Sequence, residues 1–219
     1  YEFIAERINP KDKVLDIGCG LGIGLKKLGL AETVVAIDIS PERTSEASLR
    51  NKGFPNIHVS QMDATELNFP DSFFDKVIAM EIIEHITDYS KMLSEARRVL
   101  KNEGTLILST PNFDATKQIT SDEHVKEFGR DELANLLSCF FEEIELFGYG
   151  KPKNNLLSSA YFSITKTPLY FLYRNLPLPL KSFIHYPFSK YLLGRGEIYK
   201  LYVGDSPLSL IAVCTKPKK

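Results

Sequence analysis

Cysteine is scarce in this sequence, whose 219 residues include only Cys19, Cys139 and Cys214. An odd number of widely spaced cysteines argues against a disulfide framework and favours a reducing, cytoplasmic location. No run of about 18 apolar residues could span a bilayer, and no signal peptide is recognisable. The net charge of −1 excludes the strongly basic character of many nucleic-acid-binding proteins. An initiator methionine is also missing, so we expect further residues upstream of Tyr1.

Short β-branched segments alternate with helical patterns over the first 150 residues. This alternation is typical of a parallel sheet covered by helices on both faces. We therefore predict an α/β fold, doubly wound, with a mostly parallel seven-stranded sheet in a single domain over residues 1–219. The strands are expected at residues 13–17, 33–38, 56–63, 74–80, 104–111, 141–150 and 206–217. Helices are expected at residues 24–30, 40–50, 88–103 and 129–140.

The character of the chain changes at residues 151–205, which hold 11 of the 24 Phe and Tyr residues. The segment contains eight Lys or Arg and two acids, which give it a local net charge of +6, and it contains five prolines. We interpret these residues as an insertion before the last strand. The insertion is expected to bind the acceptor as a lid or to contact a membrane surface through its apolar and basic side chains.

The stretch "VLDIGCGLGIG" at residues 14–24 places glycines at the end of a predicted strand. In doubly wound sheets, ligands bind at such a strand–turn–helix, and an acid about 20 residues further on holds a ribose diol. Asp38 occupies that position. No register of the four glycines satisfies the dinucleotide fingerprint G-x-G-x-x-G or the phosphate-binding loop, because the pattern is D-x-G-x-G-x-G.

Four segments, "VLDIGCGLG", "VVAIDIS", "QMDATELNFPDSFFDKVIAMEIIEHI" and "VLKNEGTLILSTPN", resemble the successive motifs of class I S-adenosylmethionine-dependent methyltransferases. The resemblance covers residues 13–148 and implies a Rossmann-like methyltransferase fold with S-adenosylmethionine as cofactor. Three acids at strand ends suit this cationic, phosphate-free ligand and would repel a pyrophosphate. The cofactor-binding residues implied are Asp16, Gly18, Cys19, Gly20, Asp38, Ile39, Asp63, Ala64 and Met80.

The segment "MEIIEHITD" follows the fourth predicted strand, where the resemblance places the methyl group. A hydroxyl nucleophile must lose its proton, and His85 is the expected catalytic base, with Glu81 beside it. On a helical turn, Glu81, Glu84 and His85 would share one face. Together with His124 they could bind Mg²⁺, Mn²⁺, Fe²⁺ or Zn²⁺. This set resembles the metal-dependent small-RNA 2′-O-methyltransferases and the ubiquinone-biosynthesis O-methyltransferases.

We expect the acceptor to be a small molecule with a reactive hydroxyl, such as a sugar, a glycan precursor or an aryl, catechol-like compound. A metal-dependent RNA ribose 2′-O-methyltransferase is one alternative. It is disfavoured because the chain outside residues 151–205 carries a net charge of −7, the difference between −1 and +6. An alternative of another class is a catalytically idle cofactor-binding module that holds a partner protein.

Overall fold

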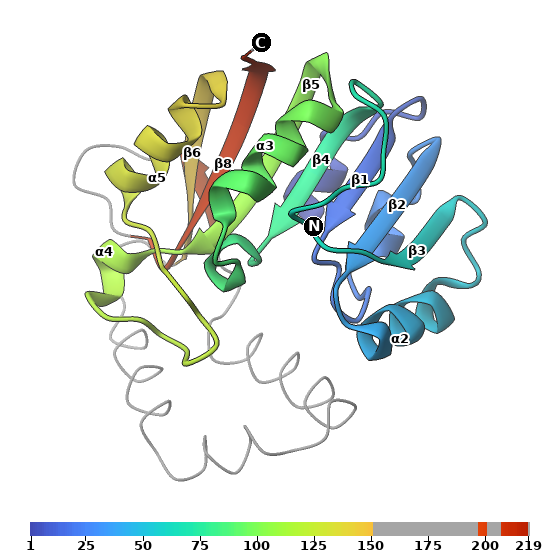
Figure 1. The fold of residues 1–219 in the computed structure, drawn as a ribbon, viewed down its shortest axis with the longest axis horizontal. Coiled ribbons are helices and arrows are strands. Elements are labelled where there is room, and N and C mark those ends of the chain that lie inside the picture. The colour runs from blue at the N-terminus through green and yellow to red at the C-terminus, as the bar shows by residue number, and fades with distance from the viewer. Residues whose placement is uncertain (151–196, 201–206, 219) are drawn as a thin grey trace, which may run out of the picture.

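The computed structural model describes residues 1–150, 197–200 and 207–218, and these residues share one eight-stranded sheet (Figure 1). The strand order is β3-β2-β1-β4-β5-β8-β6-β7. Strands β3 to β5 in this order are parallel, whereas β8 is antiparallel to both β5 and β6, and β7 is antiparallel to β6. The strands are β1 (Lys13–Ile17), β2 (Thr33–Asp38), β3 (Ile57–Gln61), β4 (Phe74–Met80), β5 (Leu100–Pro111), β6 (Phe141–Gly150), β7 (Glu197–Lys200) and β8 (Ser209–Pro217).

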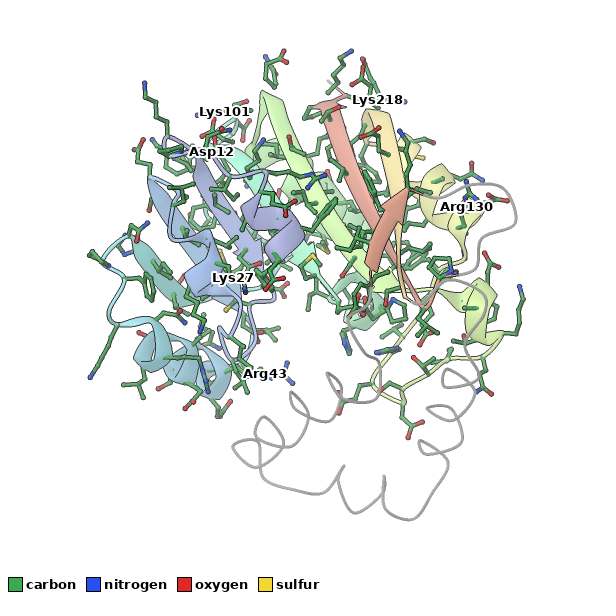
Figure 2. All side chains as sticks on the ribbon, turned by 180° about the vertical axis from the view of Figure 1, so that it is seen from behind. Asp12, Lys27, Arg43, Lys101, Arg130 and Lys218 are labelled. Atoms are coloured by element: carbon green, nitrogen blue, oxygen red, sulfur yellow. The ribbon has the colours of Figure 1, made fainter. Side chains whose placement is uncertain are left out.

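Helices cover both faces of the sheet, as the doubly wound prediction requires. In Figure 1, α3 and α5 lie over the near face; Figure 2, the view from behind, shows the blue α1 over the other. Lys27 of the following helical turn, labelled in Figure 2, donates from Nζ to Oε1 of Glu2 in α1 at 2.8 Å, so both lie on this second face. The helical elements of the described residues are α1 (Glu2–Ala5), η1 (Leu25–Leu28), α2 (Pro41–Asn51), η2 (Ile83–His85), α3 (Tyr89–Val99), α4 (Phe113–Thr116) and α5 (Arg130–Ser138).

Each face of the sheet has its own apolar core. On β5, Leu106 and Leu108 point into the core beneath α3 and α5, whereas Ile107 points into the core beneath α1 and η1. This alternation is the two-residue period of a strand. Among the described residues, no helix is long and apolar enough to span a membrane.

The seven predicted strands are all present, and β7 is an additional one. Its four residues lie inside the range interpreted as an insertion, where they pair with the end of β6. The remaining residues of that range, 151–196 and 201–205, lie outside the described residues. The acceptor-binding and membrane-surface roles proposed for them therefore stay predictions.

Two helix predictions were wrong in extent. The segment after the glycine turn forms only the 3₁₀ helix η1, and α3 ends at Val99 instead of reaching residue 103. The backbone N–H groups of Ser72 and Phe73 bond the carbonyls of Arg98 and Val99, so these last carbonyls of α3 already have partners. Leu100 is extended and begins β5, so the chain passes directly from helix to strand.

Candidate functional site

The glycine turn after β1 packs tightly on one side and is open on another. Gly18 has φ +73°, and a Cβ there would lie 2.6 Å from Cγ1 of Ile82, so a side chain is excluded. Gly20 has φ +54°, but a Cβ there would meet nothing within 4 Å. The backbone N–H groups of Gly18 and Cys19 both donate to the carbonyl of Ile37 at 2.8 and 2.9 Å. The turn is thus fixed against β2 and leaves open space beside Gly20.

Asp38 ends β2 beside that open space, as the sequence predicted. It is 5% exposed, and its two carboxylate oxygens accept from the backbone N–H groups of Gly20 (2.9 Å) and Ser40 (3.0 Å). The following residue, Ile39, is 66% exposed although it is apolar. A fixed carboxylate beside an exposed aliphatic side chain is suited to a ribose and an adenine ring.

Asp63 and Ala64 follow β3, which lies next to β2 in the sheet. The Oδ1 atom of Asp63 accepts from both the backbone N–H and the hydroxyl of Thr65 at 2.8 Å. These bonds lower the pKa of Asp63. Its backbone neighbour Met62 donates to the carbonyl of Asp38 at 3.1 Å, which ties the two predicted binding residues to one edge of the sheet.

Asp16 lies at the centre of this edge and is fully buried. Its Oδ2 accepts from the hydroxyl of Tyr1 at 2.9 Å, whereas its buried Oδ1 has no hydrogen-bond partner. Burial raises the pKa of Asp16 to about 7. An incompletely bonded buried carboxyl is costly unless a ligand completes it, so Asp16 fits a cationic ligand group. Sequence reasoning missed Tyr1, because nothing in a single tyrosine indicates this contact.

Replacing Asp16 by asparagine should increase the free energy of unfolding of the ligand-free protein at pH 8 but hardly at pH 4.5. Between about pH 4 and pH 7 the folded Asp16 keeps a proton that the unfolded chain releases, so stability falls as pH rises. The shift from 3.8 to about 7 corresponds to a loss on the order of 4 kcal/mol. Urea denaturation of both proteins at the two pH values measures the difference.

Asp63→Asn is the matched control with the opposite sign. Because the pKa of Asp63 is lowered in the folded state, the ionised form stabilises the fold above about pH 4. This variant should therefore lose stability at pH 8. A pH-independent effect of Asp16→Asn would show that its carboxyl is not held protonated.

The residues after β4 do not form the helical face predicted for Glu81, Glu84 and His85. Glu81 precedes η2 and adopts a positive φ of 52°, a strained conformation that is concentrated at functional sites. Its backbone N–H donates to the carbonyl of Ser109 at 3.0 Å, and the Ser109 hydroxyl donates to its Oε1 at 2.7 Å. Glu81 retains solvent-exposed surface, but its carboxyl group is poorly solvated, which raises its pKa.

Glu84 is held on the other side of β5. Ser109 and Thr110 are consecutive strand residues, so their side chains point to opposite faces. The Thr110 hydroxyl donates to Oε2 of Glu84 at 3.1 Å, and Glu84 is 1% exposed. Burial and the neighbouring Glu81 raise the pKa of Glu84 to about 8.

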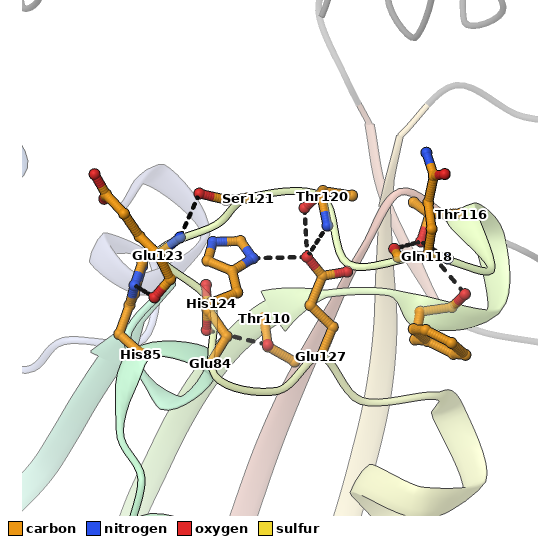
Figure 3. A network of polar contacts seen from close by, with 11 residues as sticks. Glu84, His85, Thr110, Thr116, Gln118, Thr120, Ser121, Glu123, His124 and Glu127 are labelled. Carbon is orange, nitrogen blue, oxygen red and sulfur yellow. Dashed lines mark hydrogen bonds and ion pairs between the residues drawn. The ribbon is translucent and has the colours of Figure 1, made fainter. Parts of the chain in front are cut away.

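Three of the four predicted metal ligands converge in the structure (Figure 3). One ligand atom each from Glu84, His85 and His124 lies within 4.8 Å of the other two. Tetrahedral ligands at about 2.1 Å from a small cation would be about 3.4 Å apart, so these atoms would have to approach one another to bind one. Glu81 is outside this group: its Oε1 accepts from the Ser109 hydroxyl, although its charge interacts with that of His124. We call Glu84, His85 and His124 the acid–histidine cluster.

Both imidazoles of the cluster are fixed through Nδ1. Nδ1 of His85 lies 3.0 Å from the carbonyl oxygen of Glu123, and Nδ1 of His124 lies 2.6 Å from Oε1 of Glu127. The two rings meet edge to face with centroids 4.7 Å apart. Because a carbonyl only accepts, His85 must donate from Nδ1, which leaves Nε2 able to accept a proton or bind a metal.

The loop that carries His124 is held by a β-bridge between its two ends and by hydrogen bonds to Glu84. Asn112 and Phe128 form a β-bridge at its ends. Next to His124, the backbone N–H groups of Val125 and Lys126 donate to the carbonyl of Glu84 at 2.7 and 3.2 Å. These contacts position His124 against His85.

Other predicted residues occupy the places expected of them. Met80 ends β4, and Cys19, which is 7% exposed, lies in the glycine turn. Burial raises the pKa of the Cys19 thiol to about 12, so this residue is no nucleophile at neutral pH. Sequence reasoning missed Thr110 and Glu127, the partners of the cluster, and Ser109, the partner of Glu81. The spacing "HVKE" at 124–127 was a usable signal for the last of these.

The sheet is doubly wound, its first strand leads into a glycine turn, and acids lie at the ends of neighbouring strands. These features define a Rossmann-like nucleoside-binding domain. Residues 15–108 match the family model of a methyltransferase domain. These residues therefore form a methyltransferase domain of the class I, S-adenosylmethionine-dependent type.

Individual relatives agree with this assignment. A probable S-adenosylmethionine-dependent methyltransferase of Mycobacterium tuberculosis is 34% identical over 142 residues, which are 63% of this chain and 50% of that protein. A ubiquinone biosynthesis O-methyltransferase of Bradyrhizobium is 36% identical over 102 residues, 46% of this chain and 40% of that one. The fold resembles that of a SAM-dependent methyltransferase from Aquifex aeolicus, with a TM-score of 0.55, 22% identity and coverage of 69% and 81%. The chain spans about half the length of the first of these relatives.

Proposed function

We propose that the chain transfers a methyl group from S-adenosylmethionine to a hydroxyl oxygen of a small acceptor. The observation that carries this proposal is the position of the acid–histidine cluster. Ile82 packs directly on Gly18, so the glycine turn and the segment that holds Glu84 and His85 are in contact. A group able to activate a hydroxyl thus lies beside the predicted cofactor site.

The described residues fit the cofactor by their chemistry. The unpartnered Oδ1 of Asp16 suits a cationic amino group, and the open side of Gly20 permits close approach of a ligand to the backbone. In this proposal Asp38 accepts from the ribose hydroxyls, Ile39 packs on adenine, and Asp63 with Ala64 lies at the adenine edge. Met80 and Glu81 then lie nearest the sulfonium.

The cluster also fits a divalent cation. Within the described residues, the carboxylates of Glu81, Glu84 and Glu127 accept hydrogen bonds from hydroxyl groups, one backbone N–H and one imidazole. None of these bonds comes from Lys or Arg, so no cationic side chain bonded to them balances the three acids. One carboxylate with two imidazoles suits Zn²⁺, Fe²⁺ or Mn²⁺ better than Mg²⁺, which prefers oxygen ligands.

Each residue of the cluster has a definite task in this proposal. Glu84, His85 and His124 would hold the ion, which when bound lowers the pKa of an acceptor hydroxyl. The hydroxyl gives its proton to solvent water, the oxygen forms a bond to the methyl carbon, and the carbon–sulfur bond breaks to leave S-adenosylhomocysteine. The protein supplies the alignment of the two reactants, which accounts for several kcal/mol of catalysis. In a metal-free variant of the reaction, Nε2 of His85 would accept the proton itself.

The acceptor class can be tested with labelled S-adenosylmethionine and matched acceptors. Catechols and sugars with neighbouring hydroxyls should be methylated on oxygen, and faster than their monohydroxy analogues, because two oxygens can chelate one ion. Product analysis by mass spectrometry identifies the methylated atom. Transfer to nitrogen alone would contradict the proposal. Cofactor binding without turnover of any acceptor would favour the idle binding module.

A further inference from the structure

Glu127 is a buried carboxylate that lies behind His124, outside the acid–histidine cluster (Figure 3). Its Oε1 accepts three hydrogen bonds, from the backbone N–H of Thr120 (2.6 Å), the hydroxyl of Thr120 (2.5 Å) and Nδ1 of His124 (2.6 Å). The side chain of Glu127 has no exposed surface, and its Oε2 is buried without a partner. A buried acid with so unequal a distribution of bonds needs a physical explanation.

The three bonds favour one tautomer of His124. An ionised carboxylate only accepts hydrogen bonds, so with Glu127 ionised its Oε1 accepts all three of them. Nδ1 of His124 must therefore carry the hydrogen, and its Nε2 has the free lone pair.

We propose that Glu127 is a positioning residue that holds His124 in the Nδ1–H tautomer and directs Nε2 of its ring to the acid–histidine cluster. The same loop is fixed to Glu84 by the backbone N–H groups of Val125 and Lys126. Its backbone thus fixes where His124 lies, and Glu127 fixes how the ring is turned. Carboxylates behind metal-binding histidines orient the ring and increase its basicity in this way.

The ring can be observed without any metal or acceptor. In long-range ¹H–¹⁵N spectra at pH 8 of the metal-free, ¹⁵N-labelled protein, His124 should show a protonated Nδ1 and an unprotonated Nε2. Glu127→Leu removes the acceptor at similar size and should allow the Nε2–H tautomer to appear. Glu123→Gln changes one charge in the same loop at an exposed side chain and should leave the His124 signals unchanged. An Nε2–H tautomer in the wild-type protein would overturn the proposal, even if Glu127→Leu does not fold.

A second measurement uses Co²⁺ as the probe and rests on the proposed function. Glu127→Gln should weaken Co²⁺ binding about 10–100-fold in calorimetry, whereas Glu123→Gln should not. Unchanged Co²⁺ affinity in Glu127→Gln would contradict the positioning role. If the wild-type protein bound no Co²⁺, the metal part of the proposed function would fail. The tautomer measurement would still decide the role of Glu127.

Discussion

Replacing His85 by alanine should lower kcat for methyl transfer about 10²- to 10⁴-fold, the range found for the loss of a group that removes or helps remove a proton. His85 belongs to the cluster whether a metal is bound or not, and its Nε2 is left available by the bond from Nδ1 to Glu123. Binding of S-adenosylhomocysteine should change little, because the predicted cofactor contacts are made by other residues. Steady-state kinetics with saturating cofactor, together with calorimetry, separates the two effects.

His58 provides the matched control for this substitution. It is an exposed histidine on β3, which β2 and β1 separate from β4 and the cluster. His58→Ala should therefore retain nearly full activity. Wild-type kcat in His85→Ala would mean that neither proton removal nor metal binding depends on this ring.

Removal of divalent ions should abolish turnover, and Zn²⁺, Mn²⁺ or Fe²⁺ should restore it. Glu84→Gln and His124→Ala each remove one of three ligands and should weaken metal binding at least about 100-fold, more than the loss of a residue behind the ligands. Glu81→Gln is the informative comparison, because Glu81 is bonded to Ser109 and lies outside the cluster. It should retain most of the metal affinity. Metal titrations of the chelator-treated proteins measure these differences.

Activity that survives exhaustive chelation would exclude the metal and leave His85 as the base. Equal losses of metal affinity in Glu81→Gln and Glu84→Gln would show instead that all four residues of the predicted set are ligands. Proton release on metal addition provides a further check, since imidazoles bind metals in the neutral form.

Local sequence patterns were sufficient to predict most of the sheet. The ends of β1, β2, β4 and β6 coincide with the predictions: the first three are largely apolar runs with β-branched residues, and β6 alternates acidic with apolar residues at 143–146. Helix ends were less predictable. The end of α3 depends on Ser72 and Phe73, which take up its last carbonyls from a distant part of the chain.

The candidate site was predictable to the extent that its residues end neighbouring strands. Asp16 and Asp38 are brought together by the pairing of β1 with β2, which the fold class implies. The separation of Glu81 from Glu84 was not predictable, because it depends on Ser109 and Thr110 facing opposite sides of β5. The role of Glu127 likewise depends on how the loop from Asn112 to Phe128 closes on itself.

The most direct test of the account is a crystal structure of the protein with S-adenosylhomocysteine and Zn²⁺, measured at the zinc absorption edge. We predict the ribose on Asp38 and one anomalous peak within about 2.0–2.2 Å of a Glu84 oxygen and of Nε2 of both His85 and His124. The sulfur of the ligand should face that peak. A nucleoside bound away from Asp38, or a peak at other residues with His124 turned away from His85, would contradict the account.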